Sequence, residues 1–340
     1  MSAGLLGSQP RDAEVRVPAS SANLGGGFDC IAVAVDRWLT AAASVEPERA
    51  GPPVVRRAGA LAGLAVEPER DALYLGFAAA CRAAGRPVPV GLAFDADSAI
   101  PVARGLGSSA AALVAGAALA NALLELGLDD TALVAVVSAL EGHPENAAAS
   151  VFGGGTLSVV APAPADSGGG PAFTVSPLDV HESLAFAFAV PQLALETKRA
   201  RGVLPSVVPY TTAVAAQARG AALVRGLADA SPALLAVAFD DVLHVPHRRA
   251  LVPGYDDVTR AAIAAGALGA TLSGSGSTIV AVARREIAPV VAAAMERAWR
   301  ADGVPAESFV SPARVPAMTV SRAGTAERPG SGRLNSSLHA

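Results

Sequence analysis

The 340-residue chain contains only two cysteines, Cys30 and Cys81, which lie far apart in the sequence. Such a pair cannot form the disulfide framework of a small secreted domain, and it fits reduced thiols. Positive charge is also in short supply, because 26 Lys and Arg face 30 Asp and Glu, for a net charge of −4. This balance provides no basic field for nucleic acid, so we expect no nucleic-acid partner.

Long apolar runs are missing as well. Gly, Pro or charged residues interrupt every apolar stretch, and the first residues lack a basic start followed by a run of signal length. We therefore expect no membrane partner and a soluble, cytoplasmic protein. Hydrophobic residues, by contrast, make up 52% of the chain against 16% charged residues. This content suffices for buried cores in two domains of ordinary size.

A glycine-serine stretch at 105–109 leads directly into an alanine-rich segment that predicts a helix through 110–125. Gly105 and Gly107 lack a Cβ, so the backbone can approach a ligand closely there. The first helical turn presents free N–H groups and the positive end of the helix dipole, and Ser108 and Ser109 add hydroxyl groups. These features together predict an anion cradle. The alternative is an ordinary helix N-terminus capped by Ser.

Two known phosphate motifs can be tested against this stretch. The Walker pattern requires a Lys directly before the Ser or Thr, but Gly107 stands there, so a P-loop NTPase is excluded. The dinucleotide fingerprint is matched by Gly105, Gly107 and Ala110, and Glu125 follows about twenty residues later. That fingerprint needs a strand running straight into its first glycine, and Arg104 intervenes. The loop alone leaves the type of phosphate ligand open.

Two further segments are rich in Gly and Ser. Residues 18–29 are predicted to form a polar binding loop between two apolar strands, and 269–280 a second glycine-rich loop between strands. A predicted helix over 131–140 ends in a charged turn that begins at Glu141. Its carboxylate can meet a Mg²⁺ ion held by phosphates, or can form a simple ion pair at the helix end.

Three other polar residues have two interpretations each. His143, in the same turn, is either a ligand contact or a histidine with local partners. Arg201 and Arg248 can each clamp a carboxylate with two hydrogen bonds, which Lys does less well. Taken singly, however, an arginine of this kind is usually just solvated.

Three segments resemble, in order and spacing, the signature motifs of the GHMP small-molecule kinases: VPASSANLGGGFD at 17–29, PVARGLGSSAA at 101–111 and GATLSGSGSTIVAV at 269–282. Within that superfamily, the segments at 141–148, 197–201 and 241–254 resemble those of homoserine kinases. The resemblance extends from about residue 14 to residue 320.

The resemblance implies an α+β, two-domain GHMP kinase fold. Residues 14–172 correspond to the N-terminal ATP-binding domain, which resembles domain 2 of ribosomal protein S5, and 173–320 to a ferredoxin-like C-terminal domain. Residues 1–13 and 321–340 would be flexible tails. The implied reaction is ATP-dependent phosphorylation of the L-homoserine hydroxyl to O-phospho-L-homoserine, a step of threonine biosynthesis. The active site would lie between the domains, and family members are often homodimers.

The resemblance also implies the site residues. The ATP contacts would be Pro101, Arg104, Gly105, Leu106, Gly107, Ser108, Ser109, Ala110 and Ala111. The Mg²⁺ ligands would be Ser109 and Glu141, which together with Asn146 form the predicted catalytic set. Substrate contacts would be Asn23, Asp29, His143, Asn146, Arg201, Arg248 and Gly274. The chemistry agrees, because an amino acid needs a carboxylate for its ammonium and guanidinium groups for its carboxylate.

Four positions depart from the family pattern. Gly26 and Ser277 stand where the family usually has Pro, and we expect these changes to loosen turns. Ala72 stands where Asn is common near the adenine. Glu145 replaces the usual Asp, and its extra methylene can alter rate or substrate choice in a site sensitive to small displacements. Two alternatives therefore remain at this stage: a kinase for a different amino alcohol, and a catalytically silent paralogue that binds the ligands.

Overall fold

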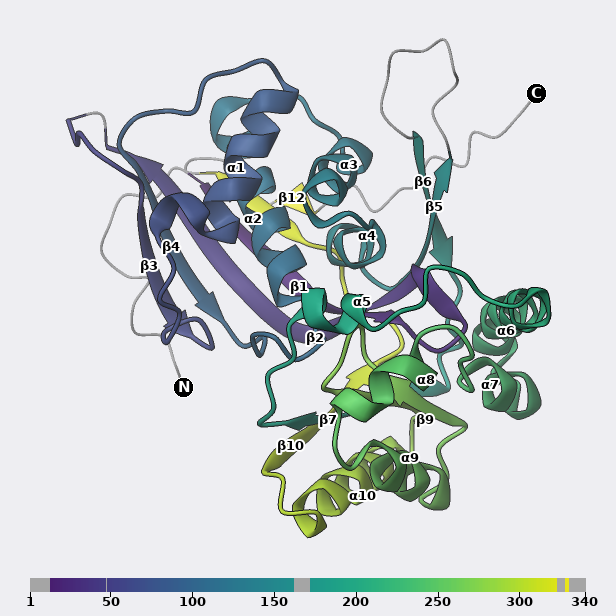
Figure 1. Ribbon diagram of the computed structural model, residues 1–340. Coiled ribbons are helices and arrows are strands. Elements are labelled where there is room, and N and C mark those ends of the chain that lie inside the picture. The colour runs from purple at the N-terminus through teal and green to yellow at the C-terminus, as the bar shows by residue number, and fades with distance from the viewer. Residues whose placement is uncertain (1–12, 47, 162–171, 323–327, 330–340) are drawn as a thin grey trace, which may run out of the picture.

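The computed structural model describes residues 13–46, 48–161, 172–322 and 328–329 (Figure 1). Within this part of the chain, strands form an eight-stranded and a four-stranded sheet. The strands of the first sheet are β1 (Ala13–Asn23), β2 (Gly27–Val45), β3 (Val54–Gly59), β4 (Leu92–Ser98), β5 (Gly155–Ala161), β6 (Ala172–Leu178), β11 (Thr319–Arg322) and β12 (Arg328–Pro329). Those of the second are β7 (Leu184–Pro191), β8 (Gly269–Leu272), β9 (Ile279–Arg284) and β10 (Ala306–Pro312).

The helices fall into three groups along the chain. Those between the strands of the first sheet are η1 (Pro68–Arg70), α1 (Ala72–Ala83), α2 (Ser108–Leu124), α3 (Asp130–Glu141) and α4 (Glu145–Phe152). The middle group comprises α5 (Thr197–Gly202), α6 (Tyr210–Asp229), α7 (Pro232–Ala238), α8 (Val245–Arg248) and η2 (Arg249–Leu251). The last two are α9 (Tyr255–Ala264) and α10 (Ala288–Ala301).

The first sheet follows the order β12-β11-β1-β2-β4-β3, and β5 and β6 extend it from β2. All its pairs are antiparallel except β3 and β4. The long strand β2 pairs with β5 near Ile31 and with β4 from Leu39 onwards, so it joins the two arms of the sheet. Helices α1 to α4 cover one face, and α2, whose residues from Ala110 to Ala120 are all buried, lies innermost (Figure 1).

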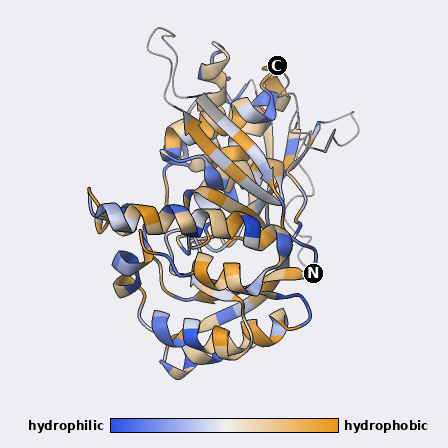
Figure 2. Ribbon diagram, turned by 90° about the vertical axis from the view of Figure 1, so that its right-hand side faces the viewer, coloured by the Kyte–Doolittle hydropathy of each residue, from blue (hydrophilic) through white to orange (hydrophobic). Residues whose placement is uncertain are grey.

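Strand β7 connects the two hydrophobic cores. Its side chains alternate, as in any strand, so that Phe186 and Phe188 point into the core shared with the first sheet. Ala187 and Ala189 point to the opposite face, into the core beneath α9 and α10. Figure 2 shows hydrophobic residues in both the upper and the lower part of the molecule, which we call its two layers: the first sheet with its helices and the second sheet with its helices. Because both faces of β7 are buried, the two layers form one packed unit.

The first motif differs from the loop predicted over 18–29. Residues up to Asn23 belong to β1 and Gly27 already begins β2, which leaves only a tight turn at 24–26. The prediction of a loop over the whole of 18–29 was wrong, because most of these polar residues continue the two strands. Ser20 and Ser21 are completely buried, and each finds a hydrogen-bond partner in another motif.

Gly26 has a packing role, which corrects the expectation that it loosens the turn. Its N–H donates a hydrogen bond of 2.8 Å to the carbonyl of Ala238, which Pro cannot do. A Cβ at this position would lie 2.6 Å from the carbonyl carbon of Arg219 in α6. Ser277 is likewise tied down, since its hydroxyl donates to the carbonyl of Leu193.

Most of the two predicted flexible tails lies outside the described residues. Ala13 and Arg322, however, pair with each other in the first sheet through β1 and β11. The predicted domain division at 172/173 stays a prediction. Strand β6, which spans it, and β11, near the end of the predicted C-terminal domain, both belong to the first sheet. In the described part of the chain, no helix is both long enough and apolar enough to cross a membrane.

Candidate active site

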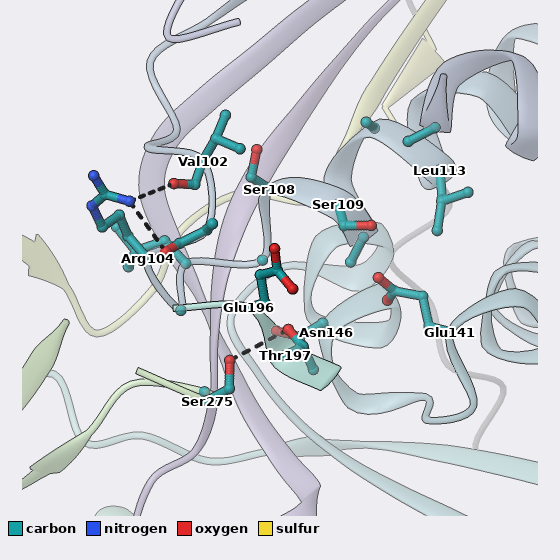
Figure 3. A pocket seen from close by; sticks show the side chains of 18 of the residues that line it. Val102, Arg104, Ser108, Ser109, Leu113, Glu141, Asn146, Glu196, Thr197 and Ser275 are labelled. Atoms are coloured by element: carbon teal, nitrogen blue, oxygen red, sulfur yellow. Dashed lines mark hydrogen bonds between the residues drawn. The ribbon is translucent and has the colours of Figure 1, made fainter. Parts of the chain in front are cut away.

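The predicted anion cradle lies at the N-terminus of α2. Gly107 is the N-cap residue, with a left-handed φ of 67°, and no side chain of the described residues caps the helix. The N–H groups of the first turn are therefore left for a ligand. Ser108, Ser109 and Ala110 all line a pocket of about 650 Å³ that opens in front of this helix (Figure 3).

The other two glycine-serine motifs hold this loop from both sides. A Cβ on Gly105 would lie 2.1 Å from the carbonyl oxygen of Ser273, and one on Gly107 would lie 2.0 Å from the hydroxyl of Ser20. The hydroxyl of Ser273 also donates a 2.6 Å hydrogen bond to the carbonyl of Gly105, and the N–H of Ser20 donates to the carbonyl of Leu106. The glycines are thus required by close packing as well as by backbone conformation.

The pocket has a polar and an apolar end. Its polar end lies near the loop and the turn at 141–146, and Figure 3 shows the side chains of Ser109, Glu141 and Asn146 there. Its apolar side chains come from α1, α2, the end of α3 and the segment before α1: Leu61, Leu64, Val66, Leu73, Leu75, Leu113 and Leu140. Sequence reasoning did not find this apolar arm, because its residues are ordinary core types scattered over four segments.

Glu141 faces Ser109 across the polar end. Burial raises the pKa of Glu141 above its ordinary value, and His143 and the hydrogen bond from Ser109 oppose this shift. Its Oε2 is buried and has no hydrogen-bond partner among the described residues. A carboxylate oxygen left without a partner beside a hydroxyl is a donor set that suits Mg²⁺, which takes oxygen ligands and usually few from protein.

Glu145 is almost completely buried, with 1% of its surface exposed. Its Oε1 lies 2.9 Å from Nδ1 of His143, close enough for an ion pair but without the alignment of a directed hydrogen bond. Burial would lower the pKa of His143, but Glu145 and Glu141 outweigh it, so that the pKa is raised. Asn146 donates to the same Oε1 at 3.0 Å.

Asp29 and Arg201 were predicted as separate substrate contacts, and the structure brings them together. Nη1 and Nη2 of Arg201 donate to the two carboxylate oxygens of Asp29 at 3.0 and 2.8 Å. This hydrogen bonding raises the pKa of Arg201. Arg201 lines the pocket whereas Asp29 does not, so in this structure Asp29 acts on the pocket through the arginine.

Arg248 is only 1% exposed and reaches the pocket from α8. Its Nε donates to the carbonyl of Ala200 in α5, and its Nη1 lies 3.4 Å from the carbonyl of Gly274 in the third motif. Burial and the nearby Arg201 lower the pKa of Arg248 to about 10. The guanidinium thus joins α5, α8 and the third motif at one corner of the pocket.

The structure also fixes where the remaining predicted residues lie. All the predicted ATP and substrate contacts line the pocket except three. Asp29 is one; Ala111 is another, because it is fully buried in the core face of α2. Pro101 instead lines a separate hollow, which Arg104 also lines.

Several pocket residues were missing from the sequence-based set. Glu196, Thr197 and Ser275 all line it, and Figure 3 shows the Glu196 carboxylate extending into it. The segment that carries Glu196 and Thr197 is held in place, since the N–H of the preceding Leu195 donates to the carbonyl of Ala103. The homoserine kinase-like segment at 197–201, which reads TKRAR, marks this part of the chain in the sequence but does not give the direction of its side chains.

Comparison with known families matches two parts of the chain. Residues 72–154 match the GHMP kinases N terminal domain, and residues 221–301 match the GHMP kinases C terminal domain. Among curated proteins, the chain is 38% identical over 303 residues to the homoserine kinase of Picosynechococcus sp., covering 87% of this chain and 95% of that protein. It is 37% identical over 286 residues to that of Moorella thermoacetica, covering 83% and 92%.

Solved structures agree in fold. A homoserine kinase from Cytophaga hutchinsonii superimposes with a TM-score of 0.77 at 28% identity, covering 94% of this chain and all of that one. A mevalonate kinase from L. major superimposes with a TM-score of 0.62 at 16% identity, over 90% and 96% of the two chains. The latter likeness is one of fold alone. The two-domain fold predicted from the motifs is thereby confirmed.

Proposed function

This chain belongs to the homoserine kinases of the GHMP kinase family, and on that premise we propose that it transfers the γ-phosphoryl group of ATP to the hydroxyl of L-homoserine. The product is O-phospho-L-homoserine, an intermediate of threonine biosynthesis. The observation that carries the proposal is the pocket itself, where a helix N-terminus suited to phosphate lies opposite two arginines suited to a carboxylate. The alternatives of another amino alcohol or a silent paralogue are not favoured by the relatives.

The loop from Gly105 to Ser109 binds the triphosphate of ATP in this proposal. N–H groups of the first turn of α2 and the hydroxyl of Ser108 donate to phosphate oxygens, and the dipole of α2 favours their negative charge. Phosphoryl transfer depends mainly on positioning and charge neutralisation, so these fixed donors are suited to the reaction. The apolar arm around Leu64 and Leu113 suits the purine base.

Ser109 and Glu141 are the residues that would hold Mg²⁺. Their fit rests on the unpartnered Oε2 of Glu141 beside the Ser109 hydroxyl. When bound, the ion neutralises charge on the phosphoryl oxygens. The described residues contain no cluster of three or more His, Cys, Asp or Glu side chains suited to a metal, so phosphate and water would supply the other ligands.

The acceptor binds at the end of the pocket formed by Arg201 and Arg248. These guanidinium groups take the homoserine carboxylate, and Asp29, which does not itself line the pocket, holds Arg201 in place. Asn146 lies between this end and the phosphate loop, where it meets the acceptor hydroxyl. Asn23, His143 and Gly274 complete the lining. A homodimer and a cytoplasmic location stay predictions.

The test is a substrate panel with purified protein, ATP and Mg²⁺. L-Homoserine should be converted to O-phosphohomoserine, detected by mass spectrometry, with a kcat/KM well above that of L-serine, L-threonine or ethanolamine. Turnover of another alcohol but not of homoserine would overturn the assigned acceptor. ATP binding by calorimetry without turnover of any alcohol would instead identify a silent paralogue.

A further inference from the structure

We propose that Ser20 and Glu145 are positioning residues that fix the side-chain amide of Asn146 in one orientation between the phosphate loop and the acceptor. The inference rests on the proposed function, in which Asn146 meets the acceptor hydroxyl. Neither Ser20 nor Glu145 belongs to the predicted set of site residues. They lie 125 residues apart in sequence, in β1 and α4, and meet only at Asn146.

The hydrogen bonds determine which way the amide faces. Nδ2 of Asn146 lies 3.0 Å from Oε1 of Glu145, and Oδ1 lies 2.9 Å from the hydroxyl of Ser20. An ionised carboxylate can only accept, so the amide NH₂ must face Glu145 and the amide oxygen must face Ser20. The Ser20 hydroxyl then donates. Within the described part of the chain, one N–H and one lone pair of Asn146 have no partner, which matches the needs of an alcohol that both donates and accepts.

Both partners of Asn146 are themselves held tightly. Glu145 is 1% exposed in the first turn of α4, where the helix dipole favours its charge, and its Oε1 also lies 2.9 Å from His143. Ser20 is fully buried, and its hydroxyl packs directly against Gly107, where any Cβ would come within 2.0 Å of it. Ser20 therefore sets the position of Asn146 relative to the phosphate loop.

This arrangement explains why the chain has Glu at position 145. A single carboxylate oxygen serves both His143 and Asn146 at normal distances. The side chain of Asp is shorter by one methylene, which withdraws the oxygen by about an ångström from both partners on the same backbone. In a transfer reaction, a displacement of that size costs on the order of 10²-fold in rate.

The experiment is a double-mutant cycle centred on Asn146. Ser20→Ala and Glu145→Ala are made alone and in combination with Asn146→Ala, and kcat and both KM values are measured with ATP and L-homoserine. Each single variant should lower kcat on the order of tenfold or more, while KM for ATP stays within about twofold. In the Asn146→Ala background neither substitution should lower kcat further, because the group that it positions is gone.

Ser150→Ala is the matched control. Ser150 lies on the same helix as Asn146, is as completely buried as Ser20, and donates a 3.0 Å hydrogen bond to the carbonyl of Pro18 on the strand that carries Ser20. Its loss should lower Tm about as much as Ser20→Ala does but leave kcat unchanged. If Glu145→Ala fails to fold, the Ser20 cycle decides alone.

A second readout does not depend on activity. The side-chain N–H of Asn146 that is bonded to Glu145, assigned by its loss in Asn146→Ala, should exchange slowly in the wild type and at least about tenfold faster in Ser20→Ala, where the amide is no longer held in one orientation. The proposal would be overturned if Ser20→Ala or Glu145→Ala lowered kcat by the same factor in the wild-type and Asn146→Ala backgrounds. Unchanged hydrogen exchange of the Asn146 amide in Ser20→Ala would also overturn it. Failure of the wild type to phosphorylate homoserine would instead count against the proposed function. The exchange measurement would then still test whether Ser20 and Glu145 fix the Asn146 amide.

Discussion

Among single residues, Glu141 provides the most direct test of the Mg²⁺ site at the phosphate end of the pocket. Glu141→Gln keeps its shape but removes the charge and one ligand oxygen, so we expect the Mg²⁺ concentration for half-maximal activity to rise roughly 10- to 100-fold. The measurement is initial rate against Mg²⁺ at saturating ATP. Glu125→Gln is the control, because Glu125 lies exposed at the C-terminal end of α2 and pairs with Arg322. Its Mg²⁺ curve should match that of the wild type, and a shift as large as that of Glu141→Gln would contradict the assignment.

The two pocket arginines can be separated from the phosphate end by kinetics. Arg201→Ala and Arg248→Ala should each raise KM for homoserine by roughly tenfold or more, since each removes a charge-assisted hydrogen bond to the carboxylate, with little change in KM for ATP. Arg199→Ala on the same helix α5 provides the exposed control. Equal effects on both KM values would refute the assignment of these residues to the acceptor end.

At the scale of elements, Gly107 can be compared with Gly127, because both have a left-handed φ, 67° and 74°. Among the residues that the structure describes, an added Cβ meets nothing within 4 Å at Gly127 but lies 2.0 Å from Ser20 Oγ at Gly107. Gly127→Ala should therefore cost only the conformational penalty, roughly 1–2 kcal/mol of unfolding free energy. Gly107→Ala should cost more and also weaken ATP binding, measured by calorimetry. Equal losses of stability and unchanged ATP affinity in the two variants would show that the packing of the loop is unimportant.

The elements with a clear sequence period were predicted closely. The helix predicted to run to residue 125 is α2, which ends at Leu124, and the helix predicted over 131–140 is α3, Asp130–Glu141. Their alanine content and their flanking Gly and Asp residues are local signals. The first motif was predicted as a loop because burial of Ser20 depends on Asn146, which lies 126 residues away. Nothing local to either residue reveals that pairing.

The site shows the same division between local and long-range information. The phosphate loop was found because its glycines, its serines and the helix follow one another in sequence. The contact of Asp29 with Arg201 spans 172 residues, and it changed two separate substrate contacts into a coupled pair. The apolar arm of the pocket stayed hidden because Leu64 and Leu113 look like any other core residues until the fold brings them to one surface.

At the scale of the whole molecule, His244 joins the two layers. Its ring stacks on that of Phe28, in β2 of the first sheet, with ring centroids 4.8 Å apart. His244 itself directly precedes α8, the helix that carries Arg248. The segment that leads into α8 is anchored by Asp241, whose Oδ2 accepts the N–H groups of residues 243–245. His244 is completely buried, so its protonation affects the packing between the layers.

This position predicts a pH dependence of stability. Burial, supported by Arg248 and opposed by Asp241, lowers the pKa of His244 from 6.5 to about 4. Between these values the unfolded chain binds a proton on this residue and the folded chain does not, so the contribution of His244 to stability is complete above pH 6.5 and falls as the pH drops towards 4. The slope approaches about 1.4 kcal/mol per pH unit for one proton. Urea unfolding of the wild type and of His244→Gln at a series of pH values measures it. The difference in unfolding free energy between the wild type and His244→Gln should shrink steadily as the pH falls from 6.5 towards 4. Taking this difference cancels the effect of the carboxylates that titrate in both proteins. A difference independent of pH would show that protonation of the buried ring does not affect the packing between the two layers.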